Sequence, residues 1–296
     1  DQDSFSLSIG TFNVEGYSVD GVEVPVSVLA ADRFNNPVPD GTAIYFTTEG
    51  GAIDSSCFTM AGGCSVTWKS QNPRPMWLGN PDPKAEPSPL SGYVFPGGGR
   101  VTVLAHAIGE ESFLDLNGDG VFNDGDVLVG IVDGNFFNYD LPEAFRDDNE
   151  NGARDLFEPF IDFNEDGIYN EGDGLYNGLL CAHTTLCSDV TTTHVRATGV
   201  IVMSTSKAYI EIDPSEIKLD IEDTQEIEIR VWDLNGNMMP AGTTITFAAT
   251  TGSIETPTSF VVPSTTSLGP MHLKALYKAG DEVGKGAFTV KVTSPG

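Results

Sequence analysis

The strongest constraint on the fold is an internal repeat, in which two stretches of the chain match without gaps at an offset of 201 residues. Nine of the 24 positions are identical between residues 31–54 and 232–255. Hydrophobic residues recur at every second position in both copies, as in Val24, Val26 and Val28 and in Ile227, Ile229 and Val231. This alternation is typical of strands with one buried face, and no long amphipathic helix is evident. The sequence therefore predicts an all-β chain of two tandem antiparallel β-sandwiches.

The turn that follows the first of these strands carries a recognisable motif. Residues 32–41 read Asp-Arg-Phe-Asn-Asn-Pro-Val-Pro-Asp-Gly, and the next strand ends in Gly-Gly-Ala-Ile. This pattern resembles the bacterial Ig-like modules of the invasin/intimin group, and the second copy differs in having Met238 in place of proline. The resemblance covers most of 5–109, 192–204 and 207–296. It implies Ig-like modules that serve as spacers, stalks or adhesive tips on bacterial surfaces.

The repeat also suggests the domain boundaries. We expect a first module over 1–205, interrupted by an insert over 110–191, and a second module over 206–296. Matching the strand at 100–109 with that at 270–279 places the insert where the second copy has a hairpin of about six residues. The last strand of the first module is then expected at 194–204. Residues 4–14 form either the first strand of their own module, which we favour, or a donor strand for a neighbour's sheet.

The insert contains three acidic loops that match the calcium-binding loop of an EF-hand. Side-chain oxygens are expected from positions 1, 3, 5, 9 and 12, a carbonyl from position 7, and a sharp glycine turn at position 6. The ligands expected in the first loop are Asp115, Asn117, Asp119, Val121, Asn123 and Asp126. Those in the second loop are Asp147, Asn149, Asn151, Ala153, Asp155 and Glu158. Those in the third loop are Asp162, Asn164, Asp166, Ile168, Asn170 and Asp173. The sequence thus predicts about three Ca²⁺ ions.

These loops lack the flanking helices of true EF-hands and resemble the helix-poor calcium loops of dockerins and thrombospondin-type repeats. Residues 110–178 hold 19 acidic residues and two arginines, a net charge of −17. Solvated acidic turns are the alternative interpretation, but mutual repulsion in such a segment favours bound cations. Asp at the twelfth position of the first and third loops suggests weak sites, suited to the calcium concentration outside cells. We expect the insert to be irregular and ordered by calcium.

Composition limits the partners and the compartment. The formal net charge is −28, which makes nucleic acid and anionic lipid poor partners. No run of 18 apolar residues predicts a membrane span. Because residue 1 is Asp, we expect a mature form or an excised fragment. The cysteines form two close pairs, Cys57 with Cys64 and Cys181 with Cys187, and we favour two local disulfides over cross-pairing. Disulfides indicate an oxidising, extracellular location.

A search for catalytic motifs gives no candidate. The sequence has no Gly-x-Ser-x-Gly elbow, no phosphate-binding glycine loop and no HExxH motif. The histidines are His106, His183, His194 and His272, and those at 106 and 272 lie in expected strands. We therefore expect no catalytic site and no enzyme.

The interpretation that we favour is an extracellular, calcium-binding structural or adhesive protein of a bacterial surface. One alternative is a self-assembling filament or matrix subunit, joined by calcium or by strand exchange. Another is a calcium-dependent glycan-binding module, with Trp77 in the proline-rich segment 73–99 as part of a platform. The expected partners are neighbouring Ig-like modules, identical subunits, or a glycan or host-cell receptor. Neither nucleic acid nor membrane insertion is expected.

Overall fold

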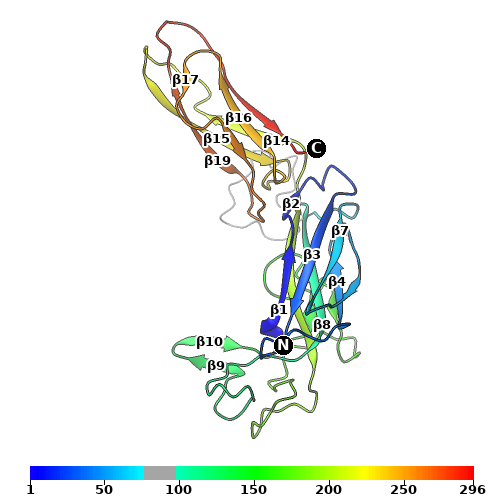
Figure 1. The fold of residues 1–296 in the computed structure, drawn as a ribbon. Helices are drawn as coiled ribbons and strands as arrows, with labels where there is room; N and C mark the ends of the chain where they lie inside the picture. Colours follow the sequence, from blue (N-terminus) through cyan, green and yellow to red (C-terminus); the bar gives the residue numbers. More distant parts are fainter. Residues whose placement is uncertain (77–97) are drawn as a thin grey trace. The chain divides into compact units, whose positions relative to one another are not determined.

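The computed structural model describes residues 1–76 and 98–296, and their regular structure is almost entirely β (Figure 1). The one exception is a 3-10 turn, η1 (Gln2–Ser4), before the first strand. The chain divides into two compact units. The first contains Asp1–Gly10, Val24–Trp68 and Thr102–Gly199. The second contains Thr11–Glu23, Lys69–Val101 and Val200–Gly296. None of the described residues forms a helix that is long and apolar enough to cross a membrane.

The first sandwich consists of two sheets. The four-stranded sheet has the order β1 (Phe5–Ile9), β3 (Glu23–Ala30), β7 (Gly63–Lys69), β5 (Ala52–Ile53). The five-stranded sheet has the order β2 (Asn13–Val14), β13 (Thr193–Met203), β8 (Arg100–Gly109), β4 (Ala43–Thr48), β6 (Ser56–Phe58). β1 pairs antiparallel with β3 of its own sheet, as we favoured over a donor strand.

The core of this sandwich is built from strands in which buried and outward-facing side chains alternate. In β3 the side chains of Val24, Val26 and Val28 are buried while their neighbours face outward. Trp68 of β7 is also fully buried, and its indole N–H donates to the Gly50 carbonyl at 2.9 Å. A buried indole N–H without an acceptor would cost free energy, so this bond lets the large ring fill the core.

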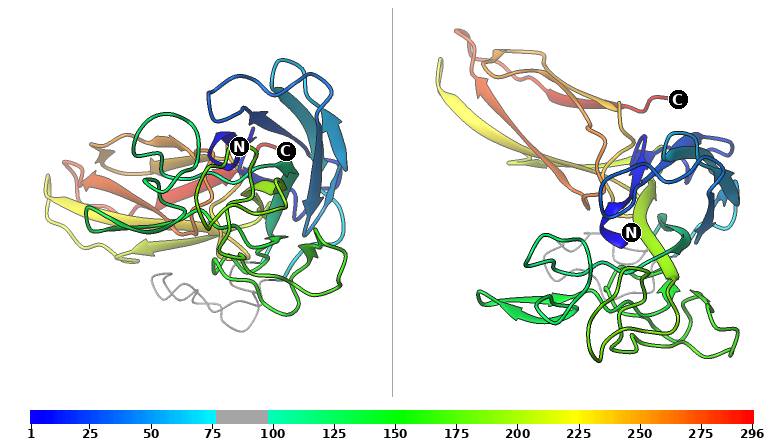
Figure 2. Two further views of the ribbon diagram at one scale, coloured as in Figure 1. Left: turned by 90° about the horizontal axis from the view of Figure 1, so that it is seen from below. Right: turned by 60° about the horizontal axis from the view of Figure 1, so that its bottom comes forward.

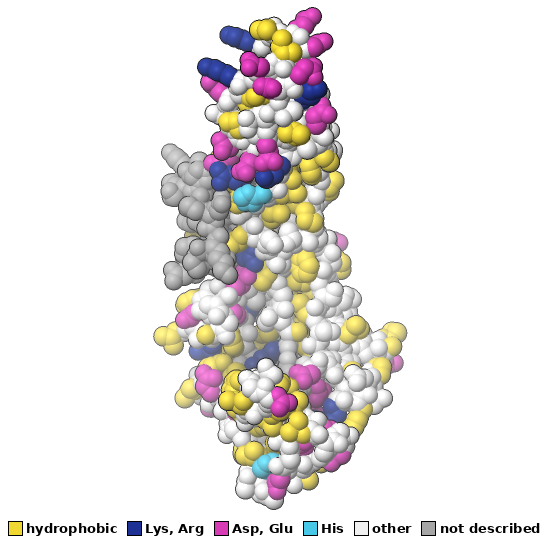
Figure 3. All heavy atoms as spheres, turned by 90° about the vertical axis from the view of Figure 1, so that its left-hand side faces the viewer, with side chains coloured by type: hydrophobic (Ala, Val, Ile, Leu, Met, Phe, Trp, Pro, Cys, Tyr) yellow, Lys and Arg dark blue, Asp and Glu magenta, His cyan; other side chains and the backbone are white. Residues whose placement is uncertain are grey.

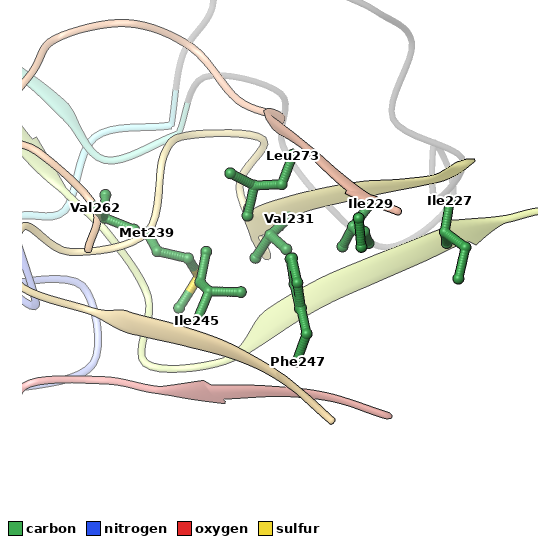
Figure 4. Packing of buried hydrophobic residues seen from close by; sticks show 9 residues of the cluster. Ile227, Ile229, Val231, Met239, Ile245, Phe247, Val262 and Leu273 are labelled. Atoms are coloured by element: carbon green, nitrogen blue, oxygen red, sulfur yellow. The ribbon is translucent and has the colours of Figure 1, made fainter. Parts of the chain in front are cut away.

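The second sandwich repeats the plan with fewer strands. One sheet has the order β14 (Ala208–Asp213), β15 (Thr224–Asp233), β19 (Met271–Lys278), β17 (Ser253–Ile254). The other has the order β18 (Ser259–Val261), β16 (Thr244–Ala249), β20 (Phe288–Thr293). Figure 4 shows Ile227, Ile229 and Val231 of β15 beside Ile245 and Phe247 of β16 in one apolar core.

The strands confirm the sequence repeat over its first half. β4 and β16 differ by 201 residues, and so do β5 and β17. Beyond them the predicted match of residues 100–109 with 270–279 is wrong. β19 lies between β15 and β17, so it corresponds to β7, which lies between β3 and β5. β8 pairs with β4 as β20 pairs with β16, so β8 corresponds to β20 and not to β19. Both candidate strands alternate in hydrophobicity, so periodicity could not distinguish them and only the pairing partners do.

The acidic insert lies between β8 and β13. β13 forms where the last strand of the first module was expected. Figure 2 shows the insert, drawn in green, as loops with little regular structure. Its short ribbons are β9 (Val129–Val132) with β10 (Asn135–Asn138), and β11 (Ala144–Phe145) with β12 (Phe160–Ile161). The ribbon of β9 and β10 exposes Val129, Ile131 and Phe136. It points toward the viewer in Figure 3, where yellow side chains gather in the lower part of the molecule.

Both disulfides join the close cysteine pairs. Cys57 of β6 bonds to Cys64 of β7, and Cys181 bonds to Cys187 within the insert. These are the two local pairings that the sequence favoured. Trp77 and most of the proline-rich segment lie outside the described residues.

Candidate metal centre

The first loop folds around the carboxylate of Asp115. Its Oδ1 accepts the N–H of Gly118 at 2.6 Å, and its Oδ2 accepts the N–H of Gly120 at 2.8 Å. Asp115, Asp119 and Asp126 each place an oxygen within 4.8 Å of the others, a group that can hold a metal ion. Gly120 has φ of +74°, so the turn at position 6 requires the backbone freedom of glycine.

The second and third loops repeat the hydrogen bond from the glycine at position 6 to the aspartate at position 1. The N–H of Gly152 donates to Asp147 Oδ2 at 2.7 Å, and the N–H of Gly167 donates to Asp162 Oδ2 at 2.7 Å. Both glycines have positive φ, of +80° and +76°. In all three loops, therefore, the glycine amide fixes the carboxylate at position 1 toward the inside of the turn.

A second carboxylate accepts two backbone amides in each of the first two loops. Asp126 accepts the N–H of Leu116 at 3.0 Å and that of Asn123 at 2.9 Å. These donors stand at positions 2 and 9. Glu158 accepts from the same positions in the second loop, which are Asp148 and Asp155, at 2.9 Å each. Glu158 is almost fully buried, so its carboxylate belongs to the interior of the loop.

In the third loop a residue outside the twelve-residue pattern takes this place. The N–H of Phe163, at position 2, donates to Glu143 Oε1 at 2.7 Å, and the N–H of Asn170, at position 9, donates to Glu143 Oε2 at 3.1 Å. Glu143 is 8% exposed. Asp173, which we expected to close this loop, accepts the N–H of Leu175 instead. The sequence pattern missed Glu143 because it precedes the loop by 19 residues.

Asparagine side chains complete the polar lining. Asn123 Nδ2 donates to the Val121 carbonyl at 3.0 Å, and Asn149 and Asn151 both donate to Asp155 Oδ2, at 2.7 and 2.9 Å. An amide also carries a carbonyl oxygen, so a half-turn of the amide presents an oxygen to a cation. The donor set of the loops is then oxygen throughout, which suits a hard cation such as Ca²⁺ or Mg²⁺ and not zinc or copper.

Aromatic residues pack the loops against one another. Phe122 and Tyr176 are fully buried with ring centroids 4.9 Å apart, and Leu128 completes their small core. In the other half of the insert, the Arg154 guanidinium lies 4.7 Å from the ring centroids of Phe160 and Tyr169.

Burial and neighbouring negative charges disfavour the ionised form of two acidic groups in the insert. Burial raises the pKa of Glu111 to about 7, while the N–H groups of Asn177 and Leu141 act in the opposite direction and the carboxylates of Asp140 and Asp173 add to the rise. Burial likewise raises the pKa of Asp140, and Asp173 contributes. Negative charge in this part of the insert is therefore costly without a counter-ion.

No family model and no curated protein matches the chain. Solved structures that match include the D0-D1 domain of intimin, at 10% identity and a TM-score of 0.27, over 98% of this chain and 91% of that one. They also include the Yersinia pseudotuberculosis adhesin InvE, at 9% identity and a TM-score of 0.27, over 99% of this chain and 59% of that one.

Proposed function

We propose that the chain is a calcium-binding structural or adhesive protein of a bacterial surface, in which calcium orders the acidic insert. The insert, residues 110–191, is carried by the first of two sandwich modules, 1–205 and 206–296. The observation that supports calcium most strongly is the cradle repeated in the three loops. In each one, a glycine amide orients the first carboxylate and two further amides orient a second, buried carboxylate.

The chemistry of the cradle favours calcium over magnesium. The loops offer carboxylates, amide oxygens and backbone carbonyls in flexible turns, and Ca²⁺ accepts six to eight such ligands in irregular geometry. Magnesium requires a stricter octahedron and usually keeps several waters. Three ions would also offset six of the 17 negative charges of residues 110–178, and so reduce the repulsion within the insert.

The surface location and the structural role have separate support. Two disulfides in the chain suit an oxidising compartment, and the strong negative charge disfavours nucleic acid as a partner. The motif of residues 32–41 resembles Ig-like modules that act as stalks and adhesive tips. We expect no enzymatic activity.

Calcium binding can be tested by titration. Protein stripped with a chelator should bind at least three Ca²⁺ ions per chain, counted by native mass spectrometry and followed by isothermal titration calorimetry. Asp119→Ala should remove or weaken one binding step, because Asp119 supplies one of the three grouped carboxylates of the first loop. Binding of no calcium at millimolar concentration would end the proposal.

Electron microscopy tests the structural role. Negative-stain images with and without calcium should show discrete particles in both conditions, better defined with the ion present. Filaments that appear only with calcium would favour the self-assembling subunit over the stalk or adhesin. A glycan array in calcium tests the remaining alternative, for which the segment around Trp77 was the candidate.

A further inference from the structure

Beyond the three loops, the insert contains half of a fourth. Residues 173–177 read Asp-Gly-Leu-Tyr-Asn, which repeats positions 5 to 9 of the first loop (Asp-Gly-Val-Phe-Asn, 119–123) and of the third (Asp-Gly-Ile-Tyr-Asn, 166–170). Gly174 has φ of +77°, like the glycines at position 6 of the complete loops. The residue four positions before Asp173, where position 1 should stand, is Tyr169, which cannot act as that carboxylate.

A distant aspartate occupies the missing first position. The N–H of Gly174 donates to Asp140 Oδ2 at 2.9 Å, the same bond that the glycines of the complete loops make to their own first aspartates. The N–H of Leu175 donates to Asp173 Oδ1 at 2.8 Å, as the N–H of Ile168 donates to Asp166 Oδ1 at 2.7 Å in the third loop. Asp140 therefore takes the role of position 1 in this half-loop, as Asp162 does in the third loop.

A glutamate from a third segment closes the arrangement. Glu111 is fully buried, and it accepts the N–H of Leu141 at 2.7 Å and the N–H of Asn177 at 2.8 Å. Leu141 follows Asp140 directly and so stands at position 2, while Asn177 stands at position 9. These are the two donors that hold the closing carboxylate in each of the other three loops.

We propose that Glu111, Asp140 and Asp173 form a fourth divalent-cation site, assembled from three separate segments of the insert. The inference rests on the proposed calcium function and extends it from three ions to four. The site holds three carboxylates, as do the other three when Glu143 is assigned to the third loop. Pro142 stands at position 3, so this site has one side-chain ligand fewer than the complete loops.

One oxygen of the fourth site independently indicates a missing ligand. Asp140 Oδ1 is buried and has no hydrogen-bond partner among the described residues. A buried carboxylate oxygen without a donor is costly, and a bound cation would satisfy it. The hydrogen bonds of the site leave this atom free.

Residue spacing and aromatic contacts also pair the fourth site with the first. Glu111 lies four residues before Asp115, just as Glu143 lies four residues before Asp147. Each glutamate thus precedes one loop and closes another. The equivalent aromatic contacts are edge-to-face in both halves: Phe113 with Tyr176 at 5.3 Å, and Phe145 with Tyr169 at 6.0 Å between ring centroids. The first and fourth sites form one pair, and the second and third form the other.

Native mass spectrometry during a calcium titration tests this inference. The wild-type chain should bind four Ca²⁺ ions, and Asp140→Asn should lose one of them or bind it at least tenfold more weakly. Asp133→Asn is the matched control, because Asp133 is exposed in the turn between β9 and β10 and its positive φ is tolerated by asparagine. Asp173→Ala tests the same site without altering a buried group, since Asp173 is exposed.

A double variant distinguishes the fourth site from the third. Asp162→Ala should remove the third ion, and combining it with Asp140→Asn should remove two. Loss of only one ion in the double variant would place Asp140 in the third site and overturn the inference. Three ions in both wild type and Asp140→Asn would overturn it as well, while leaving the proposed function intact. No ion in the wild type would overturn both.

Discussion

Glu143 shows how far the role of one residue can depend on backbone amides. Its carboxylate is buried with hydrogen bonds from Phe163 and Asn170, and these two donors fix it at the open side of the third loop. A buried carboxylate costs free energy unless it is hydrogen-bonded or paired with a cation. The two amides offset part of this cost, and a bound cation would offset the rest.

Removing this charge should affect one calcium site. Glu143→Gln keeps the size of the side chain but removes one of the three carboxylates that we assign to the third loop. We expect at least tenfold weaker binding at one step of a calorimetric titration, or about 1.4 kcal/mol. Glu171→Gln, at the exposed position 10 of the same loop, where no ligand is expected, is the control and should leave every step unchanged. If Glu143→Gln binds like wild type while Asp173→Ala weakens the third loop, Asp173 is the closing ligand.

The site residues differ in how well the sequence could reveal them. In the first two loops the carboxylate at position 12, Asp126 or Glu158, accepts the amides of positions 2 and 9, so the hydrogen-bonded loop lies within the predicted twelve residues. In the third loop Asp173 fits the pattern as well as a true closing residue does. The donors that select Glu143 are backbone amides, which every residue type except proline offers, so the twelve-residue ligand pattern could not identify it. The repetition of Glu-x-Phe-x-Asp at Glu111 and Glu143 was the available sequence signal.

Among the strands, β8 and β13 place two histidines side by side, the buried His106 and the half-buried His194. His106 of β8 lies between Tyr45 of β4 and His194 of β13, with ring centroids 5.6 and 5.0 Å away. Burial lowers the pKa of His106 to about 4, and the neighbouring His194 contributes. Burial also lowers the pKa of His194, so both imidazoles are neutral in the folded chain near pH 7.

This pair should make the first sandwich sensitive to acid. Between pH 6.5 and about 4 the unfolded chain binds a proton at His106 that the folded chain does not, so the free energy of unfolding should fall as pH is lowered through this window. One proton corresponds to at most about 1.4 kcal/mol per pH unit. Thermal unfolding in saturating calcium at pH 7 and 5 measures the effect.

Two variants check the origin of this pH dependence. His106→Phe should reduce the loss of stability between pH 7 and pH 5, because the titrating group is gone and an aromatic ring remains. His272→Gln should behave like wild type, since His272 is exposed on β19. An equal pH dependence in His106→Phe and wild type would show that other groups are responsible.

The strands also show where sequence periodicity stops being informative. The spacing of β4 and β16 was predicted without error, because identical residues at Gly41 and Gly242 and at Phe46 and Phe247 fix the alignment. No such identities mark β8, and its alternation fits β19 as well as β20. Hydrogen-bond partners, which depend on contacts between distant parts of the chain, decide the topology.

At the scale of the whole molecule, the insert and the second sandwich should respond differently to chelation. The insert has a net charge of −17 over residues 110–178, and the apolar cluster buried within it consists of Phe122, Leu128 and Tyr176. Two like charges about 4 Å apart at a protein surface repel by about 4 kcal/mol at intermediate effective dielectric. Removing calcium should therefore speed hydrogen exchange in 110–180.

The second sandwich serves as an internal control for that experiment. Its core contains no residue of the acidic loops, so exchange in residues 207–296 and the melting transition of this sandwich should not change on chelation. Unchanged exchange in residues 110–180 would instead mean that the aromatic contacts hold the insert without metal. That result would contradict our account of its carboxylates.

The exchange of closing glutamates between loops has a consequence for protein engineering. A segment of residues 162–173 grafted into another protein would leave its closing carboxylate, Glu143, behind. The smallest portable unit that contains both members of a pair is 143–170. Deleting the first loop together with Glu111 should likewise damage a site formed by residues 140 and 173–177. The loops are therefore modular in pairs and not singly, and a designer should transplant, shorten or duplicate them two at a time.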